Sequence, residues 1–193
     1  MKQIIRENAF ALLISSGDKL RATHSMMMLN DDDDPDRFYL ETHISRANPQ
    51  AKVLKNGDEL LCDFLGAHSY ISSSWYEQIN VSTWNYEAVQ IYGKAEIMDA
   101  SELYNHLEKL TYKYEKFQQC PVFVKDMGKE FVEKEMKGAF GLKIIPTEIY
   151  IKQKLSQNRK EADFQNIITQ LEKTDESGKR IAEKMKLIKS NTL

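Results

Sequence analysis

The stretch that decides the fold is TWNYEAVQIYGKAEIM, residues 83–98. Along its second half apolar and polar side chains alternate, since Val89 and Ile91 are interleaved with Gln90 and Tyr92. Successive side chains of a β-strand point to opposite faces of a sheet, so a period of two indicates a strand with one buried face. The stretch therefore predicts a long strand, half buried and half exposed.

The rest of the chain supplies partners for this strand. Apolar or alternating runs bounded by turn residues predict five more strands, at residues 9–14, 20–29, 38–45, 58–65 and 141–154. Pro146 lies within the last of them, which suggests a bulge or an edge position. Many such strands with helices at the periphery predict an α+β fold built on a small antiparallel β-barrel with peripheral and C-terminal helices.

Helical periodicity appears mainly after the long strand. We expect one helical turn at residues 48–54, a helix at 103–117 behind an Asp99-x-x-Glu102 capping box, a weaker helix at 125–137 and two helices in the C-terminal tail. The tail is mildly basic and amphipathic. We therefore divide the chain into a barrel domain with inserted helices, residues 1–158, and a helical extension, residues 159–193, packed on the barrel or on a dimer partner.

Composition narrows the class of protein. The chain has 193 residues, 27 Lys or Arg against 29 Asp or Glu, and a formal net charge of −2. This near-neutral balance gives no support for DNA binding, which usually needs an excess of cations. No apolar run is long enough for a membrane span, and the charged residues 1–8 do not resemble a signal peptide. Cys62 and Cys120 lie in unrelated contexts, which favours a reducing compartment. We expect a cytoplasmic protein without membrane partners.

Motifs for metal binding and for nucleophilic catalysis are missing from the sequence. The acidic run at residues 31–36 lacks the ligand spacing and the glycine of a calcium loop, so we expect a solvated hairpin tip. His24, His43 and His68 have no carboxylate at a spacing that completes a metal site, and we expect no metal. There is no P-loop, dinucleotide motif or nucleophile elbow, so catalytic residues stay unknown.

Polar residues gather where the strand at 38–45 ends. Ser45, Arg46 and Asn48 bring a hydroxyl, a guanidinium and the start of a turn together. Hydroxyl donors, a forked cation and free backbone N–H groups are what a phosphate requires. The alternative is an ordinary strand-to-helix turn, with Asn48 as its cap and Arg46 in solvent.

Two further segments carry binding-type residues. Residues 66–76 combine aromatic rings with hydroxyls in an expected loop. In the long strand, Thr83 and Asn85 share the face of Val89 and Ile91, which places polar groups at the end of a core-facing row. Such a row suggests the mouth of a barrel that holds a ligand, and the neighbouring Trp84 offers a flat surface to a ring or an interface.

These segments together resemble the PaiB-like family of FMN-binding negative transcriptional regulators. The motifs that carry the resemblance are Ala22-Thr23-His24, residues 43–50 (HISRANPQ), residues 68–76 (HSYISSSWY), Thr83-Trp84-Asn85-Tyr86 and residues 154–159 (KLSQNR). The family differs from this chain in often having Pro at the positions of Ser73 and Ser82 and an aromatic residue at Ala51, and in a longer N-terminus.

The resemblance implies a split β-barrel of the pyridoxamine-phosphate-oxidase type, usually a homodimer with FMN at the subunit interface. Residues 21–28 would run along the isoalloxazine ring, and the turn at 43–50 would hold the ribityl phosphate. Lys154 to Arg159 would contact a phosphate or enter a helix, with Asn158 as its cap. The cofactor-binding residues implied are Thr23, His24, Ser25, His43, Ile44, Ser45, Arg46, Asn48, Tyr70, Trp75, Thr83, Trp84, Asn85 and Lys154.

Three functions are compatible with this resemblance. The first is a flavin-binding transcriptional regulator, which is the function that the family implies. The second is an FMN-dependent oxidoreductase or flavin reductase, because hydride transfer by a flavin needs no catalytic motif from the protein. The third is a cofactor-free interaction module in which the aromatic segments form a dimer interface.

Overall fold

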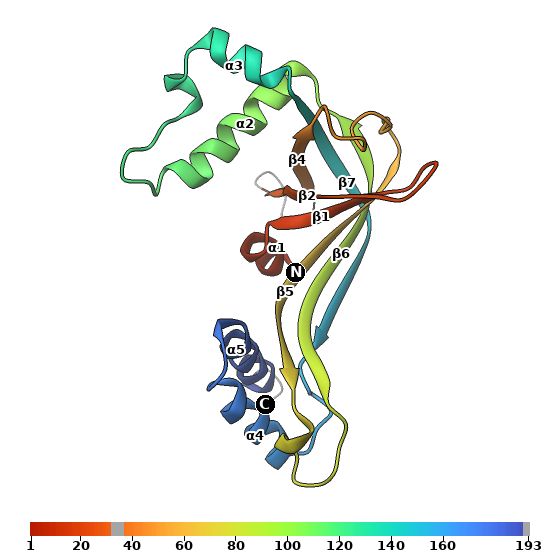
Figure 1. The fold of residues 1–193 in the computed structure, drawn as a ribbon, viewed down its shortest axis with the longest axis vertical. Coiled ribbons are helices and arrows are strands. Elements are labelled where there is room, and N and C mark those ends of the chain that lie inside the picture. Colours follow the sequence, from red (N-terminus) through yellow and green to blue (C-terminus); the bar gives the residue numbers. More distant parts are fainter. Residues whose placement is uncertain (32–36, 191–193) are drawn as a thin grey trace.

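A computed structural model describes residues 1–31 and 37–190 of the chain. The described residues form a seven-stranded antiparallel sheet with helices at both of its ends (Figure 1). The strands are β1 (Phe10–Ser15), β2 (Arg21–Met26), β3 (Met28–Asn30), β4 (Tyr39–Ser45), β5 (Glu59–Ile71), β6 (Thr83–Ile97) and β7 (Ala139–Lys154). The helices are α1 (Lys2–Glu7), α2 (Ala100–Glu115), α3 (Lys129–Met136), α4 (Glu161–Leu171), α5 (Glu176–Ser190) and the short 3₁₀ turns η1 (Ser73–Trp75) and η2 (Val124–Asp126).

A break at Met27 closes the barrel. The strand expected at residues 20–29 divides there into β2, which pairs with β1 at one edge of the sheet, and β3, which pairs with β4 at the other edge. Met27 is fully buried, and its N–H donates to the carbonyl of Ala9 at 2.8 Å. Because one short segment belongs to both edges, the sheet must curl until they meet. The prediction of one continuous strand is wrong for this reason, whereas the predicted antiparallel split barrel is confirmed.

The barrel interior is the larger of two main apolar cores. Its members come from every long strand, and the most deeply buried include Leu13, Leu40, Cys62, Phe64, Ile91, Leu142 and Ile144. Helix α1, which was not predicted, adds Ile4 and Ile5 to this core. The alternation seen in the sequence of β6 is thus the alternation between this core and the outer face of the sheet.

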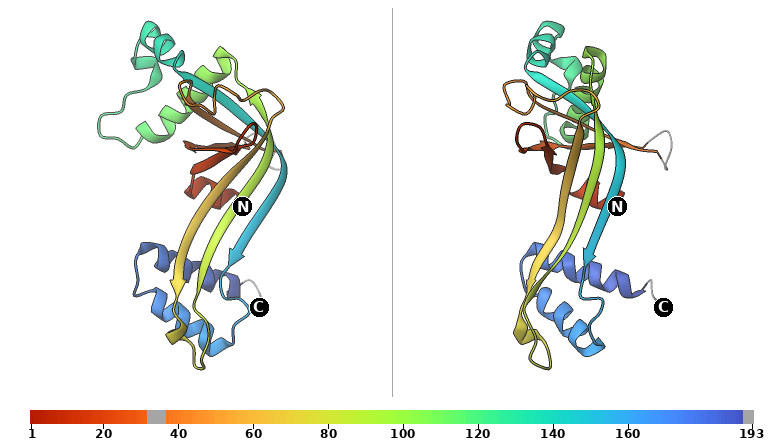
Figure 2. Two further views of the ribbon diagram at one scale, coloured as in Figure 1. Left: turned by 45° about the vertical axis from the view of Figure 1, so that its right-hand side comes forward. Right: turned by 90° about the vertical axis from the view of Figure 1, so that its right-hand side faces the viewer.

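The second core lies at the far end of the long strands. β5, β6 and β7 continue past the barrel, and α4 and α5 pack against this extension, which we call the tip (Figures 1 and 2). The core of the tip is formed mainly by Ile71, Tyr76, Leu155, Phe164, Ile167, Ile168, Leu171, Ile181 and Met185. No helix among the described residues has both the length and the apolar composition that crossing a membrane requires.

Strand β5 is longer than predicted because a bulge lets it bend without ending. β5 runs to Ile71, and its pairing with β6 shifts register between Leu65 and His68. The expected loop at residues 66–76 is therefore wrong over its first half, which is strand. A second register shift lies between Tyr92 and Gly93 of β6, opposite Pro146. The bulge that Pro146 suggested in the sequence is therefore present.

Three helix predictions need correction, whereas the helix behind the capping box and the two helices of the C-terminal tail are confirmed. Residues 46–53 form successive turns, of which only the last is helical, since the N–H of Leu54 donates to the carbonyl of Gln50 at 3.3 Å. Gly128 with a positive φ of 79° separates η2 from α3. The N-cap of α4 is Lys160 rather than Asn158. The Asp99–Glu102 capping box is present as predicted. The expected hairpin tip lies largely at residues 32–36, outside the described residues.

Gly93 tests the packing at the second bulge. A Cβ there would lie 2.6 Å from both Ile144 Cγ2 and the carbonyl oxygen of Ile145, which is a clash with backbone. We expect Gly93→Ala to lower the free energy of unfolding by about 1–3 kcal/mol. The matched control is Gly17→Ala, whose new Cβ would have only the Arg21 guanidinium near it, at 3.9 Å. Equal midpoints of urea unfolding for the two variants would show that β6 and β7 are not packed in this way.

Candidate functional site

The predicted site residues form two groups at opposite ends of the molecule. The barrel group lies on β2, β4 and the turn that follows, and comprises Thr23, His24, Ser25, His43, Ile44, Ser45, Arg46 and Asn48. The tip group comprises Tyr70, Trp75, Thr83, Trp84, Asn85 and Lys154. Ser45 pairs with Ala139 where β7 begins, and Lys154 ends that strand, about 50 Å further along it at the usual rise per residue. One chain does not bring the two groups together (Figure 1).

The turn after β4 is held to β2 by Asn48. Its side-chain amide donates to the hydroxyl of Thr23 at 3.0 Å, and its oxygen accepts from the N–H of Gln50 at 2.8 Å. The Ser45 hydroxyl accepts from the N–H of Ala47 at 3.2 Å. These local bonds fix a compact turn without a helix, so the expected help of a helix N-terminus is absent here. What stays available is the exposed end of the turn, with its hydroxyl and guanidinium.

Arg46 is exposed and borders a pocket. Its guanidinium lies 5.7 Å from the centre of the Phe140 ring, and none of the described carboxylates forms an ion pair with it. A pocket of about 420 Å³ opens beside it, lined by Arg46, Met98, Asp99, Ala100, Leu103, Glu133, Met136 and Lys137. An exposed guanidinium without a carboxylate partner is free to bind an anion.

Two members of the barrel group serve the fold with their side chains. The Ser25 hydroxyl donates to the carbonyl of His43 at 2.7 Å and lies 2.7 Å from the hydroxyl of Thr42, which donates to the carbonyl of Met26 at 2.8 Å. These buried bonds join β2 to β4 where the barrel closes. Ile44 points into the core. Ser25 and Ile44 therefore offer a ligand only their backbone groups.

The two histidines of the barrel group have different surroundings. His24 is exposed on the outer face of β2 and stacks on Phe10, with ring centres 5.7 Å apart. His43 is half-buried, and its Nδ1 lies 3.1 Å from Nε2 of His106 on α2. Burial, and then the nearby charge of His106, lower the pKa of His43. His43 thus belongs to a buried polar contact with α2.

Sequence reasoning missed His106 and its second neighbour, Glu41. His106 is fully buried, and its Nδ1 lies 3.5 Å from Oε2 of Glu41, which is also buried. A signal was present: His106 follows Leu103 by three residues, so it lies on the apolar stripe of the predicted helix. A polar residue on such a stripe needs a polar partner, and β4 supplies two.

Three members of the tip group, Thr83, Asn85 and Lys154, line a second pocket. Asn85 is fully buried and exchanges hydrogen bonds of 3.0 and 3.1 Å with Ser156, and the amine of Lys154 donates to the hydroxyl of Thr83. A pocket of about 470 Å³ lies here, lined by Val81, Thr83, Asn85, Gln153, Lys154, Ser156, Gln157, Asn158 and Arg159. Its two cations and several amides and hydroxyls suit a polar, anionic ligand group.

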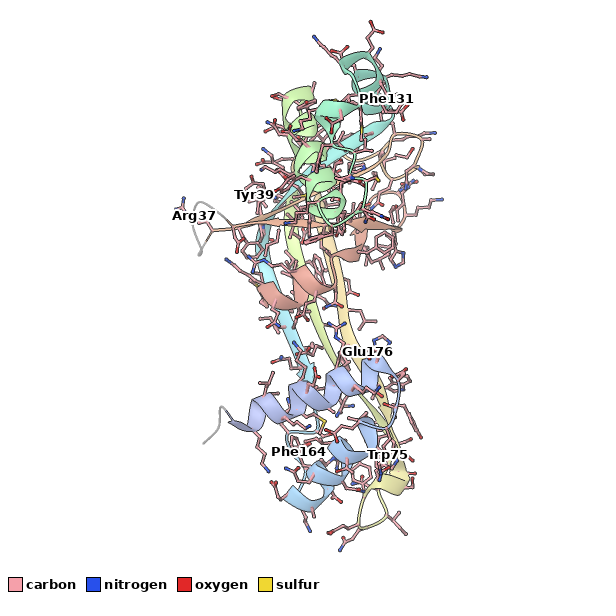
Figure 3. All side chains as sticks on the ribbon, turned by 90° about the vertical axis from the view of Figure 1, so that its left-hand side faces the viewer. Arg37, Tyr39, Trp75, Phe131, Phe164 and Glu176 are labelled. Carbon is pink, nitrogen blue, oxygen red and sulfur yellow. The ribbon has the colours of Figure 1, made fainter. Side chains whose placement is uncertain are left out.

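The aromatic members of the tip group lie in two different places. Tyr70 and Trp84 are exposed and meet edge to face, with ring centres 6.1 Å apart, on the outer face of the sheet. Trp75 instead packs on the tip core close to Phe164 (Figure 3), and its carbonyl accepts from Asn166 at 2.8 Å. Tyr70 and Trp84 are thus placed to meet a ligand or a partner, whereas Trp75 supports the helical end.

Curled antiparallel strands that are closed through one bent segment define a split-barrel protein. The turn after β4 presents an exposed hydroxyl and an exposed guanidinium on its surface. The chain belongs to the family described as "Putative FMN-binding domain", which it matches over residues 1–148. It is 39% identical over 183 residues to the "Protease synthase and sporulation protein PAI 2" of Bacillus subtilis (strain 168), covering 94% of this chain and 87% of that protein. The resemblance to the PaiB-like family is confirmed.

Solved structures show the same fold at low identity. A FAD and heme binding protein from Mycobacterium smegmatis aligns with a TM-score of 0.59 and 14% identity, covering 78% of this chain and 68% of that one. A candidate 5-nitroimidazole antibiotic resistance protein from Bacteroides thetaiotaomicron aligns with a TM-score of 0.52 and 14% identity, covering 77% and 78%. At this identity the likeness concerns the fold alone.

The lowered pKa of His43 predicts a pH dependence of stability. In the unfolded chain a histidine titrates near pH 6.5, about its ordinary value. As the pH falls below that value the unfolded chain takes up a proton before the folded one does, so His43 makes folding less stable toward acid. We expect His43→Gln to reduce the loss of unfolding free energy between about pH 7.5 and pH 5.5, measured by urea unfolding. His24→Gln, at an exposed position, should keep the wild-type dependence; the idea fails if both variants do so.

Proposed function

We propose that this protein is an FMN-binding dimer of the PaiB-like regulator type, in which each flavin lies between the barrel group of one chain and the tip group of a second copy. The observation that carries the proposal is the separation of the two groups along β7. Residues at opposite ends of a strand of about 50 Å contact one cofactor only if two chains lie side by side in opposite directions. A two-fold axis provides that arrangement and makes two equal sites.

The outer face of the sheet supports such a pairing. Large apolar side chains on β1, β5, β6 and β7 lie exposed on this one face, among them Phe10, Leu65, Tyr70, Trp84 and Tyr150. A monomer seldom leaves so many large apolar groups of one sheet face in water, and such patches mark interaction surfaces. A second copy packed on this face would cover them and bring its tip toward the barrel group.

The residues present fit the phosphate of FMN. Ser45 and Arg46 are exposed at the turn, and Arg46 has a free guanidinium, so a phosphate would gain a hydroxyl and two parallel N–H donors. Lys154 and Arg159 would add cations from the partner's tip. Bound FMN would supply hydride or single-electron chemistry, and these side chains would hold and orient it.

The regulatory role and the enzymatic alternative are distinguished by experiment. The name of the Bacillus subtilis relative contains the words protease synthase and sporulation, and the family resemblance implies a transcriptional regulator. Specific promoter binding with a steep salt dependence would support that role. Rapid bleaching of bound flavin by NADH or NADPH, with transfer to an acceptor, would support an FMN-dependent oxidoreductase instead. A cytoplasmic location stays a prediction.

Arg46 tests the phosphate site. Arg46→Ala removes the forked cation, and hydrogen bonds to a charged group contribute about 1.5–3 kcal/mol, so we expect FMN affinity to fall about 10- to 150-fold. Quenching of FMN fluorescence on titration with protein gives the dissociation constant. Lys52→Ala removes an exposed cation from the same turn and should bind like the wild type. Equal affinity of all three proteins would place the phosphate elsewhere.

A heterodimer tests whether two chains share each site. Arg46→Ala and Lys154→Ala chains carrying different affinity tags are co-expressed, and the mixed dimer is isolated through both tags. One of its sites combines both defects and the other is intact, so we expect about half of the wild-type flavin content per dimer. Each variant alone should retain little flavin. A mixed dimer as poor in flavin as the two parents would mean that each site lies within one chain.

A further inference from the structure

A buried chain of three titratable side chains runs from β4 into α2. Glu41 and His43 lie two residues apart on one face of β4, and α2 covers that face with His106. Glu41 Oε2 lies 3.5 Å from Nδ1 of His106, and Nε2 of His106 lies 3.1 Å from Nδ1 of His43. Carboxylate, imidazole and imidazole therefore follow one another in a line.

Burial assigns the protons in this chain. Glu41 is 4% exposed and His106 is 0% exposed, and neither Glu41 Oε2 nor His106 Nδ1 has a hydrogen-bond partner among the described residues, although the two atoms face each other at 3.5 Å. Buried polar atoms need partners, so the proton of His106 belongs on Nδ1, pointing to the carboxylate. Nε2 of His106 is then an acceptor and takes the proton on Nδ1 of His43. Nε2 of His43 keeps a free lone pair.

The surrounding groups favour an ionised Glu41. Burial alone would raise the pKa of this carboxyl, but the hydrogen bond with His106, the charges of Lys109 and His106 and a hydrogen bond with Asn30 together lower it. Lys143, the neighbour of Glu41 on β7, is paired with Glu102. The carboxylate of Glu41 is thus negative at neutral pH, although it is buried.

The open end of the Glu41–His106–His43 row of side chains lies at His43. This side chain is half-buried, and Ser45, on the same face of β4 two residues further on, begins the turn that carries Arg46. A ligand held at this turn would have His43 as its nearest titratable neighbour along the strand. The Glu41–His106–His43 row of side chains therefore leads from a buried carboxylate to the candidate anion site.

We propose that Glu41, His106 and His43 form a proton relay in which Nε2 of His43 is a general base for a ligand bound beside the turn after β4. The ligand class is an anion with a dissociable N–H or O–H group. The relay itself is independent of the proposed function, which supplies only the expectation that this ligand is FMN or a molecule bound next to it.

Proton transfer through the relay is balanced. Nε2 of His43 accepts one proton from the ligand, and the proton on its Nδ1 passes to Nε2 of His106. The imidazolium formed on His106 is stabilised by the carboxylate of Glu41, as in an Asp-His pair of a hydrolase. The reverse sequence returns the proton to the ligand. His43 would be the catalytic residue, and Glu41 and His106 are positioning residues that set its tautomer and its proton affinity.

Long-range ¹H–¹⁵N spectra of protein labelled with ¹⁵N-histidine read the tautomers directly. The chain has four histidines, and His43→Gln and His106→Gln assign two of them. At about pH 7.5 we expect both His43 and His106 as the Nδ1–H tautomer, which is the minor tautomer of free histidine. The tautomers are read from the flavin-free wild-type protein, so the result does not depend on FMN binding, and the two variants serve only to assign the signals. Finding either residue as the Nε2–H tautomer would overturn the proposal.

Glu41→Gln tests the role of the carboxylate. Removing the negative charge destabilises an imidazolium beside it, so the pair should take up its first proton at a pH about one unit or more below the wild-type value. Glu59→Gln, at an exposed position on β5, is the matched control and should titrate like the wild type. An unchanged titration of Glu41→Gln would refute the relay. Titration of the same wild-type sample with FMN separately tests the proposed function.

Discussion

The structure depends on one constraint: residues 21–30 must belong to both edges of a single sheet. β2 completes one edge and β3 the other, with the buried Met27 between them. The closure is completed by side chains rather than by a ladder, since Ser25 and Thr42 donate across to the carbonyls of His43 and Met26. Joining the edges in this way protects backbone groups that an open sheet would expose. It also places the barrel group directly at the seam.

Closure uses only part of each long strand, and this creates the two ends of the molecule. β7 pairs with β4 only as far as Ile144, and beyond that point it is one of the two outer strands of the extension. The extension is stable because α4 and α5 give it a core of its own and because its buried charge is compensated. Glu87, 2% exposed, accepts from Gln153 at 2.6 Å and lies 3.6 Å from the amine of Lys184 on α5. Leaving such a buried charge unpaired costs about 3–5 kcal/mol, so this pair fixes α5 to the sheet.

The sequence predicted those features that depend on local periodicity. The alternation around Val89 and Ile91 located β6, and Asp99 with Glu102 located the start of α2. The division at Met27 was not predictable from the pattern, because each half alternates like an ordinary strand and only the pairing separates them. The Glu41–His106–His43 chain was missed for a related reason. His106 is far from Glu41 and His43 in the sequence, and a buried histidine reveals its partners only when helix and strand are packed.

The approach of α2 to β4 depends on the absence of a side chain. Gly141 of β7 pairs with His43, and a Cβ at this glycine would lie 2.8 Å from Sδ of Met98 and 3.0 Å from Cδ1 of Leu103. Any side chain here would push the start of α2 outward. His106 follows Leu103 by three residues, so the same shift would lengthen its contacts with both Glu41 and His43. The absence of a side chain at Gly141 thus lets α2 lie close enough to β4 for His106 to contact both Glu41 and His43.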